Sequence, residues 1–483
     1  MTGPNRHGCR AAALPLLLLL GLAGCATNPV SGHHEFNLVS AAQEEKMGRE
    51  GYQAVLAEYG AYEDSTVQQY VASVGKKLAK VTELPGIDWH FTVIDDPSVN
   101  AFAMPGGYVY ITRGILAYLN SEAQLAGVMG HEMGHITARH TARQITSEQV
   151  AGVGLLVGSI FVPSVGRYGD VAQQALGLMF LGYSRAHETE ADELGIKYAT
   201  MAGYDPRVIP ATYHMLKRVS DRTGARLPTF LETHPDPGDR EAHTRSLAEA
   251  SAMGKGDLVV NGDGYLEMVS GLVYGNDPTQ GYFVNNQYFN PSLKLQIILP
   301  PGWSYHDTRA ALLAMPSDGK GGIEIHGADA KQESPAAYIE DLRSKGRITE
   351  AAGNTETLSG HQAWVGRVNA SGGGQGGGHM LVTLVRWTPE LMIEMLGQGT
   401  DETMIFTTMR SIKDLTDPKK LAMKPDTLFI ERVKQPGVFS ALVPTYGMQA
   451  LSVEETAILN KWISTEQVPV GQPLKLVALG HTK

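Results

Sequence analysis

The segment His131–His135, which reads His-Glu-Met-Gly-His, constrains this chain more than any other short stretch. It lies inside a pattern that predicts a helix over residues 121–145, beginning with the capping-box spacing at Ser121. On a helix, side chains four positions apart differ by about 40° in direction and about 6 Å in height. His131 and His135 can therefore offer two imidazoles to one metal ion, with Glu132 projecting beside them.

A third ligand is needed for a catalytic zinc ion, and thiolates are excluded from the body of the chain. The two cysteines, Cys9 and Cys25, both lie in the first 25 residues, so a disulfide-stapled fold is excluded as well. A third histidine six residues after His135 would define another zinc-protease class, but Thr141 stands there. His140 is one position off that spacing and is interpreted as supporting the site or as structural.

The other source of a ligand is a carboxylate from a later helix. Residues 188–192 read Glu-Thr-Glu-Ala-Asp, which places Glu188 and Asp192 one turn apart on one face. One of them can bind the metal while the other orients a ligating histidine. Glu190 is predicted to face solvent.

Composition bounds the class of protein. With 483 residues, 43% of them hydrophobic and 19% charged, the chain is globular, and its length predicts about three domains. The formal net charge of −10 argues against a general nucleic-acid binder, so no nucleic-acid partner is expected.

The N-terminus has the pattern of a bacterial targeting segment. Arg6 and Arg10 precede an apolar run over residues 11–22, which ends in Leu-Ala-Gly-Cys at Cys25. Twelve residues make a helix of about 18 Å, shorter than a bilayer core of about 30 Å. We therefore expect a signal peptide over 1–24 and lipidation of Cys25, with an ordinary cleavage site as the alternative. Residues 26–40 are expected to form a polar tether.

Further elements are predicted from residue clustering and from turn signals. Strands are expected at 89–94 and 107–112, and helices at 170–201 and 206–222. The apolar stretch 150–162 is interpreted as a buried helix, with a membrane-leaning helix as the alternative. Gly and turn residues become more frequent after residue 250. The change predicts a first domain over 25–270 that carries the candidate metal ligands, an α+β domain over 280–415 and a small unit over 427–480. The glycine run 372–378 is expected to be a hairpin tip.

Four segments resemble the CAAX-prenyl-protease-type zinc metallopeptidases, the family of the HtpX-type and BepA-type bacterial quality-control proteases. The segments are Asn100–Gly107, His131–His140, Ser184–Asp192, and Thr233-His234-Pro235 with Arg240 downstream. The similarity covers about residues 28–250, and its N-terminal part resembles the lipoprotein branch. It implies an α+β chain headed by a mostly helical, gluzincin-type domain with a small edge-strand sheet.

The resemblance also implies the site. One Zn²⁺ per chain is held by His131, His135 and Glu188, with Asp192 and Arg185 beside the ligands. Glu132 is the general base, which takes a proton from water and passes it to the leaving amine. The expected activity is that of a zinc metalloendopeptidase acting on misfolded or misassembled envelope proteins, anchored on the periplasmic face of the outer membrane. A non-proteolytic assembly factor that keeps the fold is the alternative.

Other residues have more than one interpretation. The edge strand Ala101, Phe102, Ala103 and Met104 can pair with an extended peptide or be an ordinary hairpin strand. His234 can close the open metal position as a latch, assist an oxyanion or pack the next helix, and Arg240 is the other oxyanion candidate.

The C-terminal regions carry weaker resemblances. Residues 281–415 resemble a PsbP/Mog-type α+β fold and are interpreted as a binding module. Residues 427–480 are weakly similar to a LysM repeat, with a plain docking domain as the alternative. Cell-wall glycan or envelope assembly machinery are therefore the additional partners expected.

Overall fold

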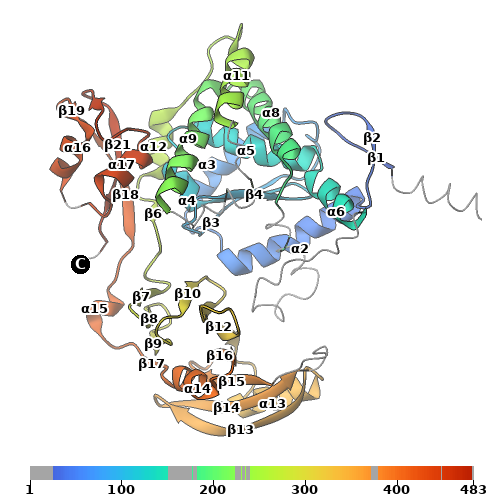
Figure 1. The fold of residues 1–483 in the computed structure, drawn as a ribbon, viewed down its shortest axis with the longest axis vertical. Helices are drawn as coiled ribbons and strands as arrows, with labels where there is room; N and C mark the ends of the chain where they lie inside the picture. Colours follow the sequence, from blue (N-terminus) through green and yellow to red (C-terminus); the bar gives the residue numbers. More distant parts are fainter. Residues whose placement is uncertain are drawn as a thin grey trace, which may run out of the picture.

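The computed structural model describes residues 25–150, 177, 182–223, 230, 234, 240–370, 379–447 and 449–480. These residues form two bodies, and the chain passes from the first to the second and back (Figure 1). Residues 282–414 build the second body, and the C-terminal residues return to the first. Helices and strands are mixed in both, as the predicted α+β class requires.

A three-stranded sheet lies inside the first body. Its order is β3-β5-β4, with β3 (His90–Ile94) parallel to β5 (Tyr108–Thr112) and β4 (Ala101–Met104) antiparallel to β5. The predicted strands at 89–94 and 107–112 are confirmed. Val109 and Ile111 of β5 belong to one hydrophobic cluster, and Tyr108 and Tyr110 belong to another. Because alternate residues of a strand point to opposite faces of a sheet, both faces of this sheet are covered. The covering helices are α2 (Ala41–Tyr59), α3 (Ser65–Ala79) and α5 (Glu122–Thr137).

The single helix predicted over 121–145 is wrong in one respect, because the structure has two helices there. Ser121 caps α5 as expected, but α5 ends at Thr137 and α6 runs from His140 to Val150. Between them Arg139 has φ 56°, a left-handed conformation that cannot continue an α-helix. The chain therefore turns before His140 and changes the direction in which that side chain points.

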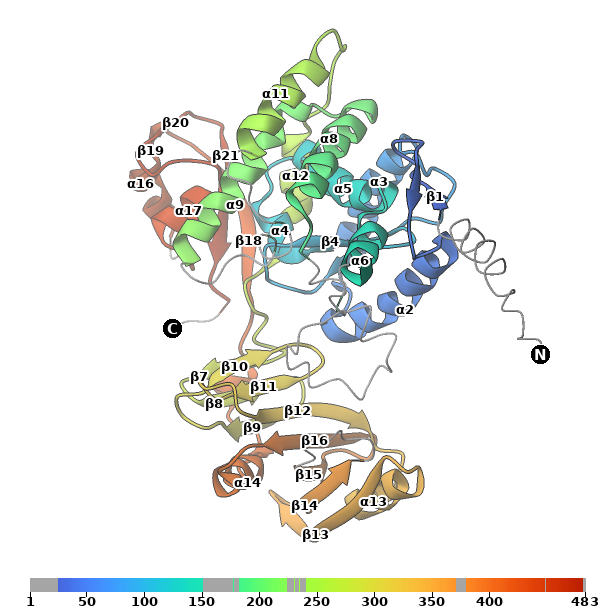
Figure 2. The same ribbon diagram turned by 45° about the vertical axis from the view of Figure 1, so that its right-hand side comes forward.

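Helix α8 (Arg185–Met201) lies directly against α5 (Figure 2). The two backbones meet at glycines: a Cβ on Gly195 would lie 2.9 Å from the His131 backbone nitrogen, and one on Gly130 would lie 3.0 Å from Gly195 O. This close approach places the first turn of α8 beside the histidines of α5. The helix predicted over 170–201 is wrong at residues 182–184, which are not helical, because Ser184 caps α8 and the helix begins at Arg185. Residues 170–181, apart from residue 177, lie outside the described residues.

The remaining helices of the first body complete its core. The helix predicted over 206–222 is divided into a short 3-10 turn and a longer helix. The bounds are α4 Arg113–Tyr118, η2 Pro206–Val208, α9 Pro210–Thr223, α11 Arg240–Ala252 and α12 Gly262–Val269.

The polar tether expected over 26–40 is wrong, because these residues are folded against the first body. β1 (Cys25–Thr27) pairs with β2 (His34–Phe36) in an antiparallel hairpin. The Asn28 side chain donates to Ala138 O at 3.4 Å, and Leu38 N donates to Thr146 Oγ1 at 3.0 Å. The hairpin is thus bound to the junction between α5 and α6, and the segment after it is bound to α6 itself.

The second body is built mainly of antiparallel strands. Its large sheet has the order β10-β11-β12-β16-β15-β14-β13, and a smaller sheet has the order β17-β9-β8-β7. The bounds are β7 Tyr282–Val284, β8 Gln287–Asn290, β9 Leu295–Ile298, β10 Ser304–Asp307, β11 Leu312–Met315, β12 Gly322–Asp329, β13 Ile348–Leu358, β14 His361–Ala370, β15 Met380–Arg386, β16 Leu391–Gln398 and β17 Lys413–Asp414. Helices α13 (Pro335–Ser344) and α14 (Glu402–Arg410) pack on the sheets. The glycine run 372–378 lies outside the described residues.

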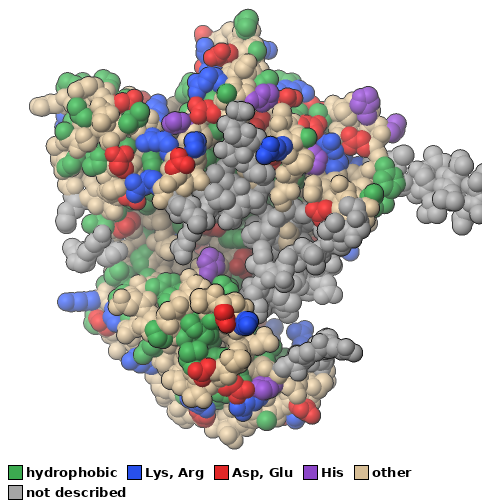
Figure 3. Space-filling model, viewed as in Figure 1, with side chains coloured by type: hydrophobic (Ala, Val, Ile, Leu, Met, Phe, Trp, Pro, Cys, Tyr) green, Lys and Arg blue, Asp and Glu red, His purple; other side chains and the backbone are tan. Residues whose placement is uncertain are grey.

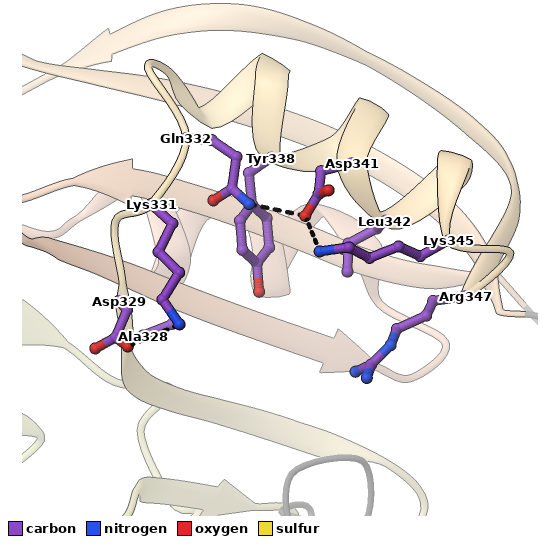
Figure 4. A pocket seen from close by; sticks show the side chains of 9 residues that line it. All are labelled: Ala328, Asp329, Lys331, Gln332, Tyr338, Asp341, Leu342, Lys345 and Arg347. Carbon is purple, nitrogen blue, oxygen red and sulfur yellow. Dashed lines mark hydrogen bonds and ion pairs between the residues drawn. The ribbon is translucent and has the colours of Figure 1, made fainter.

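A polar groove lies between α13 and the end of β12 (Figure 4). Its volume is about 280 Å³, and its lining includes Lys331, Tyr338, Lys345 and Arg347. Asp341 accepts hydrogen bonds from Gln332 and Lys345, each at 2.7 Å. The groove's charges are therefore partly paired with one another.

The unit predicted over 427–480 has a small hydrophobic cluster of its own, but other residues of the unit belong to the core of the first body. β18 (Asp426–Arg432) lies between β21 (Pro473–Ala478) and β6 (Val273–Tyr274), so one sheet joins the C-terminus to the earlier chain. Lys475 is fully buried, and its Nζ donates to Ala117 O at 2.6 Å and Leu119 O at 2.8 Å. The other elements are α15 Pro418–Leu421, β19 Gly437–Val438, α16 Phe439–Leu442, η3 Val443–Tyr446, α17 Val453–Leu459 and β20 Gln467–Val468.

The surface shown in Figure 3 mixes acidic and basic side chains over both bodies. In the part of the chain that the structure describes, no helix is long and apolar enough to cross a bilayer. The apolar stretch 150–162 lies outside the described residues beyond Val150, the last residue of α6.

Candidate metal centre

Four buried side chains converge between α5 and the start of α8. His131, His135, Glu188 and His234 offer ligand atoms that all lie within 4.8 Å of one another. The Nε2 atoms of His131 and His135 are 3.1 Å apart. Glu188 carboxylate oxygens lie 3.7 Å from each of these nitrogens. The structure thus brings together the three predicted ligands and adds His234.

The chemistry of this donor set fits a zinc ion. The Nε2 atoms of His131 and His135 face each other at 3.1 Å. Their lone pairs repel each other unless a proton or a cation lies between them. Burial, reinforced by neighbouring cationic groups, lowers the pKa of His135 well below its usual value, and a metal ligand must be the neutral ring. Imidazoles with one carboxylate are a donor set that Zn²⁺ takes in catalytic sites.

Glu132 is positioned to exchange protons beside this cluster. Its side chain is 1% exposed, and Oε1 lies 3.6 Å from His234 Nε2. That oxygen accepts no hydrogen bond from any described residue. Burial raises the pKa of Glu132 above its usual value, which brings the carboxylate closer to the basicity that a general base needs near neutral pH.

Asp192 orients His131 from behind. Its Oδ1 lies 2.9 Å from His131 Nδ1 and accepts a 2.6 Å hydrogen bond from the Tyr213 hydroxyl. Arg240 donates two more hydrogen bonds to the Asp192 carboxylate, from Nη2 to Oδ1 at 2.5 Å and from Nε to Oδ2 at 2.8 Å. Although burial alone would raise the pKa of Asp192, its bonds to His131 and Arg240 lower it below its usual range. An ionised Asp192 holds the His131 proton on Nδ1 and leaves Nε2 for the metal.

Arg240, at the start of α11, joins two carboxylates in this arrangement. Its Nη1 lies 2.9 Å from Glu188 Oε2, in addition to its contacts with Asp192. The guanidinium lies over the Tyr213 ring at 4.7 Å from the centroid. The predicted oxyanion role of Arg240 stays a prediction, while its contacts show that it orients Glu188.

His234 occupies the fourth position of the cluster. Its Nδ1 lies 3.0 Å from Glu188 Oε1 and 3.4 Å from His131 Nε2. The ring stacks on Phe230 with centroids 4.5 Å apart. Burial lowers the pKa of His234, but the carboxylates of Glu188 and Glu132 outweigh it and raise the pKa overall. The adjoining Thr233 and Pro235 lie outside the described residues.

The other predicted site residues are not among the four that converge. β4, with Ala101, Phe102, Ala103 and Met104, is the end strand of its sheet and packs against α5. Arg185 is exposed at the first position of α8. Among the described residues, no ion pair or hydrogen bond of the Arg185 side chain reaches the ligands; Arg240 makes such contacts instead. Cys25 begins β1, where its backbone is bound in the hairpin.

The sequence interpretation missed several contacts around the ligands. Glu190, predicted to face solvent, instead lies 3.1 Å from His140 Nε2 and 2.9 Å from Arg143 Nη1. Tyr183 stacks on His135 with centroids 4.0 Å apart. Tyr183 directly precedes a matched segment, which was a usable signal. Tyr213 lies on α9, away from every motif, so no local pattern could have identified it.

Comparisons with known proteins agree with this geometry. Residues 65–248 match the model of peptidase family M48, which supports a metallopeptidase over that range. The mitochondrial metalloendopeptidase OMA1 of Schizosaccharomyces pombe is 32% identical over 44% of this chain and 63% of that protein. The OMA1 of Arabidopsis thaliana is 35% identical over 40% of this chain and 37% of its own length. The beta-barrel assembly-enhancing protease of Escherichia coli K12 is 30% identical over 46% of this chain and 47% of that protein.

The alignments cover less than two thirds of these relatives' lengths. A solution structure of cyanobacterial PsbP from Synechocystis matches with 10% identity and a TM-score of 0.22, covering 27% of this chain and 94% of that one. A likeness at this TM-score carries no argument, so the predicted PsbP-type fold stays a prediction. The LysM resemblance of the C-terminus is also untested.

Proposed function

We propose that this protein is a zinc-dependent metalloendopeptidase that hydrolyses peptide bonds in misfolded or misassembled proteins of the bacterial envelope. The observation that carries the proposal is the position of Glu132 beside the buried cluster of His131, His135 and Glu188. The match of residues 65–248 to peptidase family M48 supports the reaction class. The beta-barrel assembly-enhancing proteases among the relatives support an envelope substrate.

The residues divide the work of the reaction. Zinc held by His131, His135 and Glu188 would polarise the scissile carbonyl and lower the pKa of water. Glu132 takes the proton from the attacking water and delivers it to the leaving amine. β4 offers an edge to which an extended peptide can add as a further strand. Burial of the cluster keeps these charges in a medium of low dielectric constant, where each interaction is stronger.

The variant Glu132→Gln tests the reaction class. It keeps the shape of the side chain and the three ligands but removes the base. We expect zinc stoichiometry to stay at one per chain while cleavage of an unfolded model protein falls by at least about 100-fold. Glu193→Gln, on the exposed surface of α8, is the matched control and should cleave normally.

The same variant discriminates the alternative, a non-proteolytic assembly factor. A base-deficient enzyme retains substrates, so envelope proteomics of cells carrying Glu132→Gln should show bound or accumulated proteins that the wild type degrades. If Glu132→Gln supports envelope assembly as well as the wild type, and neither protein cleaves any unfolded substrate, the assembly-factor function replaces the proteolytic one.

We further propose that His234 is a latch that occupies the metal's remaining position until substrate arrives. Its Nδ1 lies among the ligand atoms, which favours this role over simple packing. His234→Ala should then raise basal cleavage of an unfolded protein. If it stabilises an oxyanion instead, the same change should lower the rate by about 100- to 1,000-fold with zinc content unchanged.

The proposed location is the periplasmic face of the outer membrane, with a lipid anchor on Cys25. The support is the sequence pattern that ends at that cysteine. Cys25→Ser should leave the protein unprocessed or in the soluble fraction. An unmodified mature N-terminus elsewhere, measured by mass spectrometry, would overturn the anchor.

A further inference from the structure

The second ring nitrogen of His135 faces another histidine. His135 Nδ1 lies 2.9 Å from His140 Nδ1, and His140 Nε2 lies 3.1 Å from Glu190 Oε2. The three residues come from α5, α6 and α8. The His140 side chain is fully buried, so both of its nitrogens need partners from the protein.

One arrangement of protons satisfies all of these atoms when His135 binds a metal through Nε2. His135 then carries its proton on Nδ1 and donates it to His140 Nδ1. His140 carries its own proton on Nε2 and donates it to Glu190. Turning the His140 ring would break both hydrogen bonds, and turning the His135 ring would break its bond to His140 and move Nε2 away from the other ligands. The chain of bonds thus determines which nitrogen of His135 faces the ligand cluster.

We propose that His140 and Glu190 form a positioning relay for the zinc ligand His135. The proposal rests on the proposed zinc site and adds residues that act through a ligand. The relay orients His135 as Asp192 orients His131. Asp192 does so directly, because its carboxylate lies 2.9 Å from His131 Nδ1. Each ligating histidine therefore has a carboxylate behind it, one direct and one through a second imidazole.

The break between α5 and α6 makes the relay possible. In an uninterrupted helix, residue 140 would lie about 140° around the axis from residue 135, because successive residues differ by about 100°. The left-handed Arg139, with φ 56°, redirects α6 so that the His140 ring reaches back. His187 stacks on that ring with centroids 4.5 Å apart, which restricts its rotation further.

The far end of the relay is held by the N-terminal hairpin. Arg143 Nη1 donates to Glu190 Oε2 at 2.9 Å, and Arg143 Nε lies 3.6 Å from Glu35 Oε2 on β2. Glu35 also accepts a 3.1 Å hydrogen bond from Asn28. His140 and Arg143 therefore both contact Oε2 of Glu190, and the two contacts hold the carboxylate against the His140 ring.

Zinc affinity of the full-length protein tests the relay without any substrate. Competition with a chromophoric chelator measures the zinc Kd of wild type, Glu190→Ala, Glu190→Gln and His140→Gln. We expect Glu190→Ala and His140→Gln to weaken binding about 10- to 100-fold, and Glu190→Gln, which keeps an acceptor, to lie between them and wild type. Glu193→Gln, three residues along the same helix, should bind as wild type does.

A second readout separates positioning from a merely structural role. In cobalt-loaded protein, Glu190→Ala should change the visible absorption bands, because the orientation of His135 sets the ligand field. Combining Glu190→Ala with His140→Gln should weaken zinc binding little beyond the single variants, since they act in series. A variant that unfolds is recognised by circular dichroism, and Glu190→Gln then carries the test.

The outcomes distinguish the two proposals. If the wild type binds no stoichiometric zinc, the proposed function fails. If the wild type binds zinc and cleaves, but folded Glu190 and His140 variants keep its zinc Kd and cobalt spectrum, the relay is overturned and the proposed function stands.

Discussion

Substitution of Gly195 by Ala tests whether the close approach of α5 and α8 sets the geometry of the metal centre. Gly195 lies on α8 where that helix touches α5, and the added Cβ would lie 2.9 Å from His131 N and 3.2 Å from Gly127 O. Both are backbone atoms, so neither can swing aside as the end of a side chain would. The helices must separate by about half an ångström to reach ordinary contact distance.

The magnitude follows from two opposing effects. Overpacking of a tight core costs about 1–3 kcal/mol. Alanine in place of glycine inside a helix returns about 1 kcal/mol. Because the clash is with backbone, we expect the upper part of the first range and a net loss of about 1–2 kcal/mol in the free energy of unfolding. Separation of the helices also moves Glu188 away from His131 and His135, so zinc should bind about 10-fold more weakly.

Urea unfolding of the metal-free protein measures the first quantity, and chelator competition measures the second. Gly256→Ala is the matched control, because no atom lies within 4 Å of its added Cβ. It should leave zinc affinity unchanged. If Gly195→Ala unfolds at the same urea concentration as wild type or higher, with the same zinc Kd, the helices have room to spare and the close approach does not set the geometry of the site.

Two further predictions concern buried charged residues of the first body. Glu122 accepts hydrogen bonds from Tyr70 and Tyr204, and, although burial alone would raise its pKa, these bonds lower it from 4.5 to about 2. A carboxyl group whose pKa is lower in the folded state stabilises the fold at pH values above its unfolded pKa, and this stabilisation is lost as pH falls through its folded pKa. The stability difference between wild type and Glu122→Gln should therefore shrink as pH falls from 4.5 to about 2. A pH-independent difference in urea midpoints would contradict this. Lys475→Ala leaves the carbonyls of Ala117 and Leu119 without their Nζ donor and should lower the free energy of unfolding of the whole first body by about 1–3 kcal/mol. A separate early unfolding transition of the C-terminal residues alone would show that these residues and the rest of the first body are not one cooperative unit.

The sequence was sufficient for features that depend on neighbours along the chain. The four-residue spacing of His131 and His135 determines their common helix face, and the Ser121 cap determines where that helix begins. The spacing of Glu188 and Asp192 likewise places both carboxylates on one face of α8. Each of these follows from helix geometry within a few turns, so the pattern predicts the two histidines, the base and a pair of candidate carboxylates. The choice of Glu188 over Asp192 as the ligand came from the family resemblance.

Features that depend on packing between distant segments required the tertiary structure. The direction of His140 changed because Arg139 adopts a left-handed conformation. Glu190, whose side chain stays 29% exposed, is bound by His140 and Arg143 of α6, the helix that sequence periodicity had joined to α5. Residues 26–40 have the polar composition of a tether, yet the Ala138 carbonyl after α5 and the Thr146 hydroxyl of α6 bind them. Lys475 reaches carbonyls more than 350 positions away. Local composition carries no record of such contacts, because their free energy comes from burial and hydrogen bonds that exist only once the elements have packed.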